Sequence, residues 1–262
     1  MAQTYTYDSN GIDMKYAIFG RGTKPLIVIP GVSIKHVTDN ADAVEKQFSL
    51  LLENFRIYLF DRRDRISAGY TIRQMTDDLA KVLGSLGIKK ANIYGVSQGG
   101  MISLLLAAYY PDLVEKVMVV STSPFMPEET KNIFRKWADL SIKDTIKDLS
   151  ANYTDLIYSP TTLASFRDTI INGNLDSSEE DLEHFKVLCQ ALVDWDDRDY
   201  LHKIKAKVLS IGCEGDKIFG TDLAQKIAEE TNGECFIYPN EFGHGVFDEA
   251  PDMIKRIYDF FR

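Results

Sequence analysis

Residues 91–109 of this chain have the sequence ANIYGVSQGGMISLLLAAY, and this stretch decides the fold. Its first four residues predict a short strand, and residues 100–109 predict an apolar helix. Between them lies a Gly-x-Ser-x-Gly pentapeptide centred on Ser97. In a strand–turn–helix setting, this pattern predicts a nucleophile elbow, a sharp turn that exposes the serine hydroxyl at the top of a sheet. Gly95 and Gly99 fit this turn because the crowded backbone beside the serine leaves no space for side chains.

On both sides of this stretch, short apolar runs alternate with amphipathic ones. Strands are predicted at residues 5–7, 14–19, 26–29, 55–60, 91–94, 117–120, 208–211 and 235–238, and the first two flank a hairpin turn. Helices are predicted at residues 41–52, 71–86, 222–230 and 251–261, besides the helix that follows the serine. This alternation predicts an α/β fold, with a mostly parallel eight-stranded sheet and helices on both faces.

The alternation stops between Ser123 and about Lys203. Helical segments are predicted there at residues 128–140, 143–153, 161–171 and 178–193. An insertion that follows a strand ending near the serine would form a lid over it. We therefore expect a core of residues 1–123 and 204–262, with a helical cap of residues 124–203 inserted after the sixth strand.

Composition excludes some classes of partner. The chain has 262 residues, of which 45% are hydrophobic, enough for one large α/β domain or two small ones. Its formal net charge is −9. Because nucleic acids and anionic membrane surfaces both need a basic patch, this charge argues against either as a partner. A small-molecule substrate is the partner that we expect.

Cysteine usage and the N-terminal segment favour an intracellular protein. Cys189, Cys213 and Cys235 are an odd number at wide spacings, which fits neither a zinc pattern nor a disulfide framework. We expect buried free thiols in a reducing compartment. Residues 1–5 lack the basic and apolar regions of a signal peptide. No apolar stretch approaches the ~18 residues of a membrane span, so we expect a soluble cytoplasmic protein.

A serine hydroxyl needs a general base, and histidine is the usual one because its pKa lies near neutrality. The chain has four histidines. His244 lies between two glycines in the loop after the last predicted strand, and the glycines would leave its imidazole room to swing toward the sheet. His36, His184 and His202 have no partner motif, so we interpret them as surface or packing residues.

An acid is needed to orient such a histidine. Residues 212–216, with the sequence GCEGD, follow a predicted strand late in the chain. Asp216 is the preferred acid, and Glu214 is the alternative because glutamate also serves this role. The order Ser97, Asp216, His244 matches Ser…Asp/Glu…His and excludes the orders of the chymotrypsin and subtilisin families.

Two backbone N–H groups are expected to form an oxyanion hole. One belongs to Gln98, which follows the serine at a helix N-terminus, where the helix dipole also favours negative charge. The other is expected in the loop after the third strand, residues 30–33, and we assign it to Val32.

Together these residues resemble the α/β-hydrolase superfamily, in particular its capped branch that acts on small molecules. The resemblance covers nearly the whole chain, and its anchors are residues 30–32, 61–65, 95–100, 215–216 and 243–244. Members usually have His-Gly where this chain has Pro30 and Gly31, and they commonly have glycines in place of Asp64 and Ile66. Haloalkane dehalogenases and epoxide hydrolases use a nucleophilic aspartate and are disfavoured by the serine at position 97.

These features predict a serine hydrolase that cleaves a small carboxylic ester through an acyl-enzyme on Ser97, without a metal or an organic cofactor. The same constellation supports cleavage of lactone, thioester, amide and carbon–carbon bonds, and also acyl transfer. Aminopeptidase activity would need an acid to hold the substrate amine, and the insertion offers Asp194, Asp196 and Asp197. A non-catalytic ligand-binding protein on the same scaffold is the alternative of a different class.

Overall fold

The computed structural model describes residues 1–195, 197 and 199–262. The strands are β1 (Gln3–Ser9), β2 (Ile12–Phe19), β3 (Lys24–Ile29), β4 (Phe55–Arg63), β5 (Ala91–Val96), β6 (Val114–Val120), β7 (Lys207–Cys213) and β8 (Glu234–Tyr238). The α-helices are α1 (Ala41–Gln47), α2 (Ile72–Ser85), α3 (Gln98–Tyr109), α4 (Glu128–Asp139), α5 (Ile146–Ile157), α6 (Pro160–Asn172), α7 (Glu179–Val193), α8 (Asp222–Thr231), α9 (Val246–Glu249) and α10 (Met253–Phe261).

In the described part of the chain, eight strands form one sheet in the order β1-β2-β4-β3-β5-β6-β7-β8. The pairs β1–β2 and β2–β4 are antiparallel, and all other neighbouring strands are parallel. The predicted α/β fold with a mostly parallel sheet is therefore confirmed. Parallel strands end at a common edge, and ligand sites of α/β proteins form at that edge.

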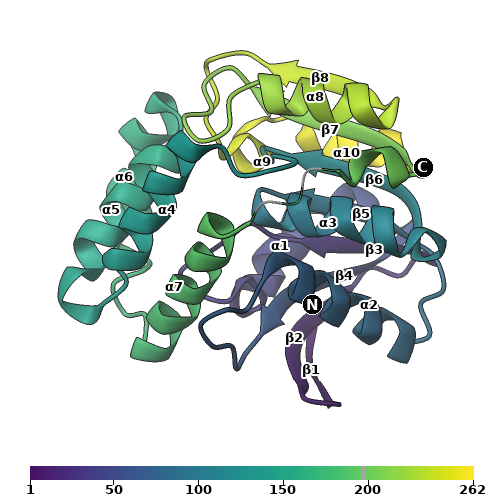
Figure 1. Ribbon diagram of the computed structural model, residues 1–262, viewed down its shortest axis with the longest axis horizontal. Coiled ribbons are helices and arrows are strands. Elements are labelled where there is room, and N and C mark those ends of the chain that lie inside the picture. Colours follow the sequence, from purple (N-terminus) through teal and green to yellow (C-terminus); the bar gives the residue numbers. More distant parts are fainter. Residues whose placement is uncertain (196, 198) are drawn as a thin grey trace.

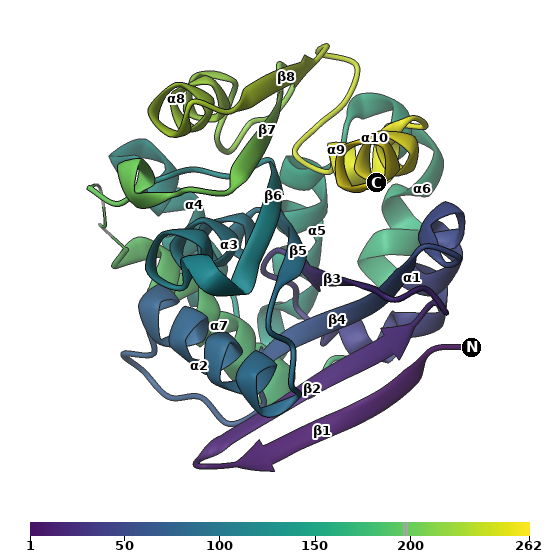
Figure 2. The same cartoon turned by 90° about the vertical axis from the view of Figure 1, so that its right-hand side faces the viewer.

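Strand β3 shows why helices cover both faces of the sheet. Ile27 and Ile29 belong to the apolar cluster that includes α2 and α3, whereas Leu26 and Val28 belong to the cluster that includes α1 and α10. Successive side chains of a strand point to opposite faces, so a continuous apolar run needs cover on both. Figure 2 shows α2, α3 and α8 on one side of the sheet and α1 and α10 on the other.

Helices α4 to α7 lie between β6 and β7 in the sequence. Figure 1 shows them gathered beside the sheet rather than on either of its faces. Helix α4 packs against α7, and α5 packs against α6. They follow β6, the strand beside β5, which ends at the serine. This position allows them to cover the edge of the sheet at which the parallel strands end.

The helix expected at residues 41–52 is shorter than predicted. Helix α1 ends at Gln47, and a 3₁₀ turn at Ser49–Leu51 follows. Both Phe48 and Leu51 are buried in the core. The tighter turn directs both side chains inward, which apolar spacing alone did not reveal.

Strand β4 and the last helix also differ from the prediction. β4 continues through Arg63 because that residue still pairs with Met14 of β2. The helix expected from residue 251 begins at Met253, and the short helix α9 was not predicted. Four residues carry too little periodicity to indicate a helix.

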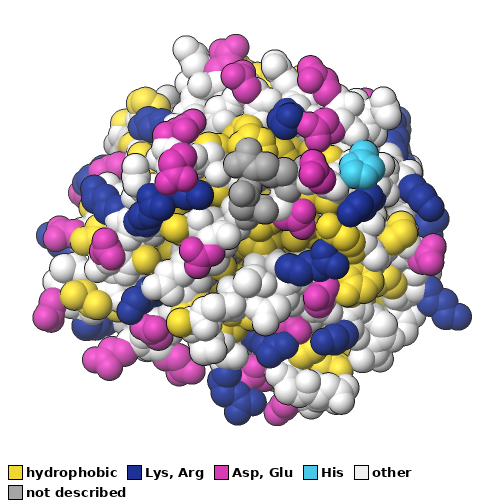
Figure 3. All heavy atoms as spheres, in the orientation of Figure 1, with side chains coloured by type: hydrophobic (Ala, Val, Ile, Leu, Met, Phe, Trp, Pro, Cys, Tyr) yellow, Lys and Arg dark blue, Asp and Glu magenta, His cyan; other side chains and the backbone are white. Residues whose placement is uncertain are grey.

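The prediction that all three cysteines are buried is wrong for one of them. Cys189 and Cys213 are buried, as expected, but Cys235 is exposed. It lies in β8, which is the last strand of the sheet formed by the described residues and pairs with β7. Among the described residues, none of the helices combines the length and apolarity that a bilayer span requires. On the face drawn in Figure 3, acidic and basic side chains are interspersed.

Candidate active site

Ser97 lies at the turn between β5 and α3. Its backbone has φ 52° and ψ −120°, a conformation that costs about 1–3 kcal/mol for a residue with a side chain. The Ser97 N–H donates to the Val120 carbonyl at 2.9 Å, and Thr122 Oγ1 donates to the Ser97 carbonyl at 2.7 Å. The end of β6 and the residues after it therefore hold the strained turn in place.

Close packing explains the glycines on both sides of the serine. A Cβ atom on Gly95 would overlap Ser103 Oγ, and one on Gly99 would overlap the Ile29 carbonyl. The first turn of α3 therefore lies directly against β3. This contact fixes the point at which the Ser97 hydroxyl emerges from the sheet.

His244 and Asp216 form a buried pair. His244 Nδ1 lies 2.9 Å from Oδ2 and 3.0 Å from Oδ1 of Asp216. Asp216 Oδ1 also accepts hydrogen bonds from the N–H groups of Ile218 at 2.7 Å and Phe219 at 3.1 Å. Because the carboxylate accepts the proton of Nδ1, the other ring nitrogen, Nε2, is the one free to act as a base.

The two candidate acids differ in position. Glu214 is exposed, and its N–H donates to the Tyr238 carbonyl at 2.9 Å. Asp216, two residues later, is the acid that contacts His244.

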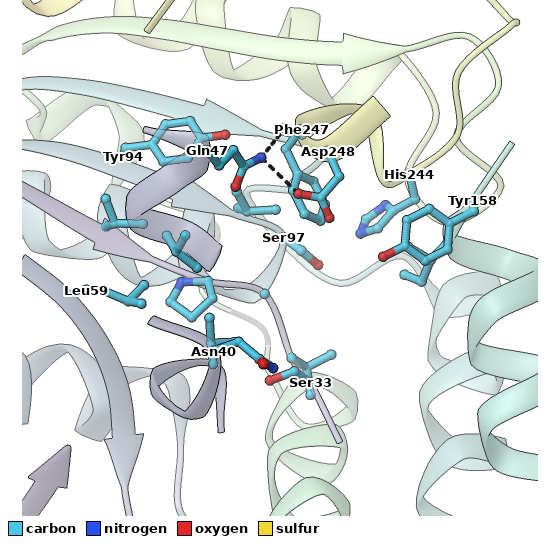
Figure 4. Close-up of a pocket in the computed structure, with 18 of the residues that line it drawn as sticks. Ser33, Asn40, Gln47, Leu59, Tyr94, Ser97, Tyr158, His244, Phe247 and Asp248 are labelled. Carbon is cyan, nitrogen blue, oxygen red and sulfur yellow. Dashed lines mark hydrogen bonds between the residues drawn. The ribbon is translucent and has the colours of Figure 1, made fainter. Parts of the chain in front are cut away.

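Ser97 and His244 line one cavity of about 330 Å³. Figure 4 shows the Ser97 hydroxyl pointing into this cavity toward the imidazole of His244. Within the described residues, no direct hydrogen bond joins the two side chains. Such contacts are often long without substrate and tighten when it binds. Phe134, Trp137 and Tyr153, from α4 and α5, form an aromatic wall of the cavity.

Two backbone donors lie close to the serine. Gln98 is the first residue of α3, so its N–H has no partner within the helix. Val32 lines the cavity next to Gly31, at which a Cβ would lie 3.1 Å from Ser97 Cβ. No oxygen of the described residues accepts a hydrogen bond from either N–H. Two such donors are suited to bind an oxyanion.

The loop after β3 is held from two directions. Asp61 of β4 accepts hydrogen bonds from the Thr38 N–H at 2.9 Å and the Thr38 hydroxyl at 2.6 Å. Tyr153 of α5 donates its hydroxyl proton to the Val32 carbonyl at 3.0 Å. The peptide groups around Val32 are thereby restrained by both the sheet and the inserted helices.

This fold and site geometry have counterparts among known proteins. The sequence model of the family described as alpha/beta hydrolase fold matches residues 24–251. The chain belongs to the α/β-hydrolase family.

The relatives of this α/β-hydrolase are themselves named as hydrolases. The putative carbamate hydrolase RutD of Yersinia enterocolitica is 26% identical over 198 residues, 71% of this chain and 69% of the relative. The 3-oxoadipate enol-lactonase 2 of Acinetobacter baylyi is 21% identical over 218 residues, 81% of this chain and 79% of the relative. This α/β-hydrolase is accordingly an enzyme of the hydrolase class.

Solved structures repeat the fold. MGS-M2, an alpha/beta hydrolase enzyme from a Medee basin deep-sea metagenome library, matches with a TM-score of 0.86 at 23% identity, covering 98% of this chain and 96% of that chain. The enol-lactonase from Burkholderia xenovorans LB400 matches with a TM-score of 0.83 at 21% identity, covering 98% and 99%.

We had expected the glycines beside His244 to leave its imidazole room to move. In this α/β-hydrolase they are closely packed instead. A Cβ on Gly243 would lie 2.7 Å from the Ile157 carbonyl, and one on Gly245 would lie 3.0 Å from Tyr158. The Gly245 N–H donates to the Ile157 carbonyl at 2.7 Å. The glycines instead allow the end of α5 to pack against the histidine loop.

The other histidines lie away from the serine. His184 of α7 donates from Nε2 to the Arg63 carbonyl at 2.7 Å, and burial lowers its pKa to about 4. Its ring lies 4.8 Å from that of His36, whose pKa is raised by the Asp61 carboxylate. These two residues pack between the inserted helices and the sheet, whereas His202 is exposed.

The sequence analysis missed four polar residues that line the cavity, which are Asn40, Gln47, Tyr94 and Asp248. Gln47 ends α1 and Tyr94 lies within β5, so no local pattern marks either one. Asp248 lies four residues after His244, in the chain segment that the histidine motif already placed at the site. That proximity was a usable signal.

The acids suggested for amine binding lie elsewhere. Asp194 and Asp197 do not line this cavity, and Asp196 is outside the described residues. Within the residues that the structure describes, no three side chains of the metal-binding types come together.

Proposed function

We propose that this α/β-hydrolase cleaves small carboxylic esters through an acyl-enzyme on Ser97. The observation that carries the proposal is the shared cavity. The hydroxyl of Ser97 and the imidazole of His244 face one another inside it, and Asp216 holds the far side of the imidazole. A strained serine, an oriented base and two free N–H donors together suit acyl transfer.

In the proposed reaction, Ser97 Oγ attacks the ester carbonyl while His244 Nε2 accepts its proton. Asp216 stabilises the resulting imidazolium. The N–H groups of Val32 and Gln98 bind the oxyanion, and loss of one such donor typically costs about 100- to 1000-fold in rate. The imidazolium then protonates the departing alcohol. Water, deprotonated by the same histidine, hydrolyses the acyl-enzyme and releases the acid.

Residues 124–203 are proposed to act as the cap of this site. Phe134 and Trp137 of α4 and Tyr153 of α5 line the cavity. These aromatic side chains would select the size of a small-molecule substrate and keep water away from the reacting atoms. In contrast, Phe166 of α6 is 58% exposed and lies outside the cavity lining.

A lactone is the second candidate substrate, and the relatives favour it. One curated relative and one solved structure are named as enol-lactonases. A lactone is an internal ester, so the same steps apply, with the alcohol remaining attached to the acyl group. The cavity of about 330 Å³ has room for either kind of small substrate.

Replacement of Ser97 with alanine tests the mechanism. The variant is expected to lose turnover of p-nitrophenyl esters and of simple lactones, while its thermal unfolding stays close to that of the parent. A fluorophosphonate probe is expected to label the parent and not the variant. Unchanged turnover in the variant would refute the assignment, and absence of both labelling and turnover in the parent would favour a ligand-binding protein.

A further inference from the structure

Asp248 extends into the same cavity as Ser97. It belongs to α9, directly after the histidine loop, and Figure 4 shows its carboxylate above the serine, beside Gln47 and Phe247. Gln47 Nε2 donates to Asp248 Oδ1 at 3.1 Å. No group of the described residues donates to Oδ2. One carboxylate oxygen is therefore left for a ligand.

The cavity holds no positive side chain that could neutralise this acid. Neither lysine nor arginine is among the residues that line it, all of which are described. Asp248 is exposed where it borders the cavity, and the protein packed around its carboxylate raises its pKa to about 6. At neutral pH the carboxylate is ionised, and it accepts one hydrogen bond, from Gln47, with no cation of the cavity lining beside it.

The walls around Asp248 are suited to a cation. Tyr94 and Phe247 line the cavity near Asp248, and Phe48, Leu59 and Ile254 are further apolar residues of the same cavity. In such surroundings a carboxylate attracts a cation more strongly than it does in water. Aromatic rings add a weaker attraction for positive charge.

We propose that Asp248 binds a cationic nitrogen of the substrate, so that the preferred substrate is an ester carrying an ammonium group. This inference rests on the proposed esterase function and narrows its substrate class. A substrate with a free carboxylate would meet the Asp248 charge without a compensating cation. The structure thus disfavours anionic esters at the same site.

Two pairs of matched esters test the proposal. Butanoylcholine is compared with dimethylbutyl butanoate, in which carbon replaces the charged nitrogen of the alcohol. p-Nitrophenyl β-alaninate is compared with p-nitrophenyl butanoate, in which a methyl group replaces the ammonium of the acid. The parent is expected to favour the cationic member of at least one pair in kcat/KM. For the β-alaninate ammonium the expected preference is about 10- to 100-fold, the usual range for a hydrogen bond to a charged group. The choline nitrogen carries no N–H, so its preference would come from charge attraction alone.

Asp248→Asn removes the charge and keeps the shape of the side chain. This variant is expected to lose the preference while hydrolysing the neutral esters at least as well as the parent, which also shows that it folds. Glu241→Gln removes an exposed charge outside the cavity lining and is expected to retain the preference. The proposal is overturned if the parent favours the neutral esters, or if Asp248→Asn keeps the cationic preference.

Calorimetric binding to Ser97→Ala protein separates this inference from the mechanism. The cationic ester of the preferred pair should bind more tightly than its neutral partner, and the addition of Asp248→Asn should abolish the difference. Absence of turnover by the parent contradicts the esterase proposal alone. Equal binding of cationic and neutral esters by the Ser97→Ala protein contradicts the role of Asp248 alone.

Discussion

Asp216 and Glu214 lie two residues apart on one loop, yet only Asp216 meets His244. The N–H groups of Ile218 and Phe219 hold Asp216 Oδ1 in place. The sequence narrowed the acid to these two residues, because both follow a strand late in the chain. The direction of each side chain depends on the turn that follows, and that turn is set by contacts with other segments.

Asp216→Asn is expected to lower kcat toward p-nitrophenyl esters by about 10⁴-fold. An amide cannot stabilise the imidazolium and favours the wrong tautomer of His244. The measurement is steady-state kinetics, with circular dichroism as a check on folding. Glu214→Gln is the matched control and is expected to stay within about threefold of the parent, a change of under 1 kcal/mol. A larger loss in the control than in Asp216→Asn would reverse the assignment.

At the scale of elements, the loop after β3 is positioned by two neighbours that are distant in sequence. Asp61 at the end of β4 holds one side, and Tyr153 of α5 holds the Val32 carbonyl. Periodicity predicted both β4 and α5 approximately. It did not predict that α5 directs a hydroxyl at this loop, because that contact depends on how the inserted helices pack against the sheet.

Tyr153→Phe is expected to lower kcat by about fivefold and to change KM little. The lost hydrogen bond frees the Val32 carbonyl and so loosens the residue whose N–H, on the preceding peptide, is proposed to bind the oxyanion as it develops. One such bond is worth about 1 kcal/mol. The measurement is kcat and KM with one p-nitrophenyl ester.

Tyr110→Phe is the control for the loss of a hydroxyl. Tyr110 donates to Asp77 Oδ1 at 2.8 Å and does not line the cavity. The kcat of the Tyr110→Phe variant is expected to match that of the parent. An unchanged kcat for Tyr153→Phe would show that the loop does not need this restraint.

At the scale of the whole molecule, the three cysteines differ in exposure to solvent, although nothing in the sequence distinguishes them. Cys189 lies in α7 and Cys213 ends β7, where each is covered by the core, whereas Cys235 is exposed on the edge strand β8. Strand order determines this difference, because β8 is the last strand of the sheet formed by the described residues.

A thiol reagent such as dithionitrobenzoate is expected to modify one cysteine in the native protein at pH 8. Buried thiols are shielded from the reagent, so the other two should react only after denaturation. Cys235→Ser should abolish modification of the native protein and leave the reaction of the other two thiols after denaturation unchanged. Rapid reaction of more than one thiol in the native protein would contradict the strand order or the burial of α7.

The sequence by itself determined the succession along the chain of the strands and of the longer helices, the turn at Ser97 and the late positions of Asp216 and His244. These features are local: apolar spacing defines each element, and steric crowding around one serine requires glycine at Gly95 and Gly99. Only the tertiary structure decided which faces of distant elements meet. It brought Asp248 of α9 beside Gln47 of α1, because side chains that share a cavity are selected by packing rather than by spacing along the chain.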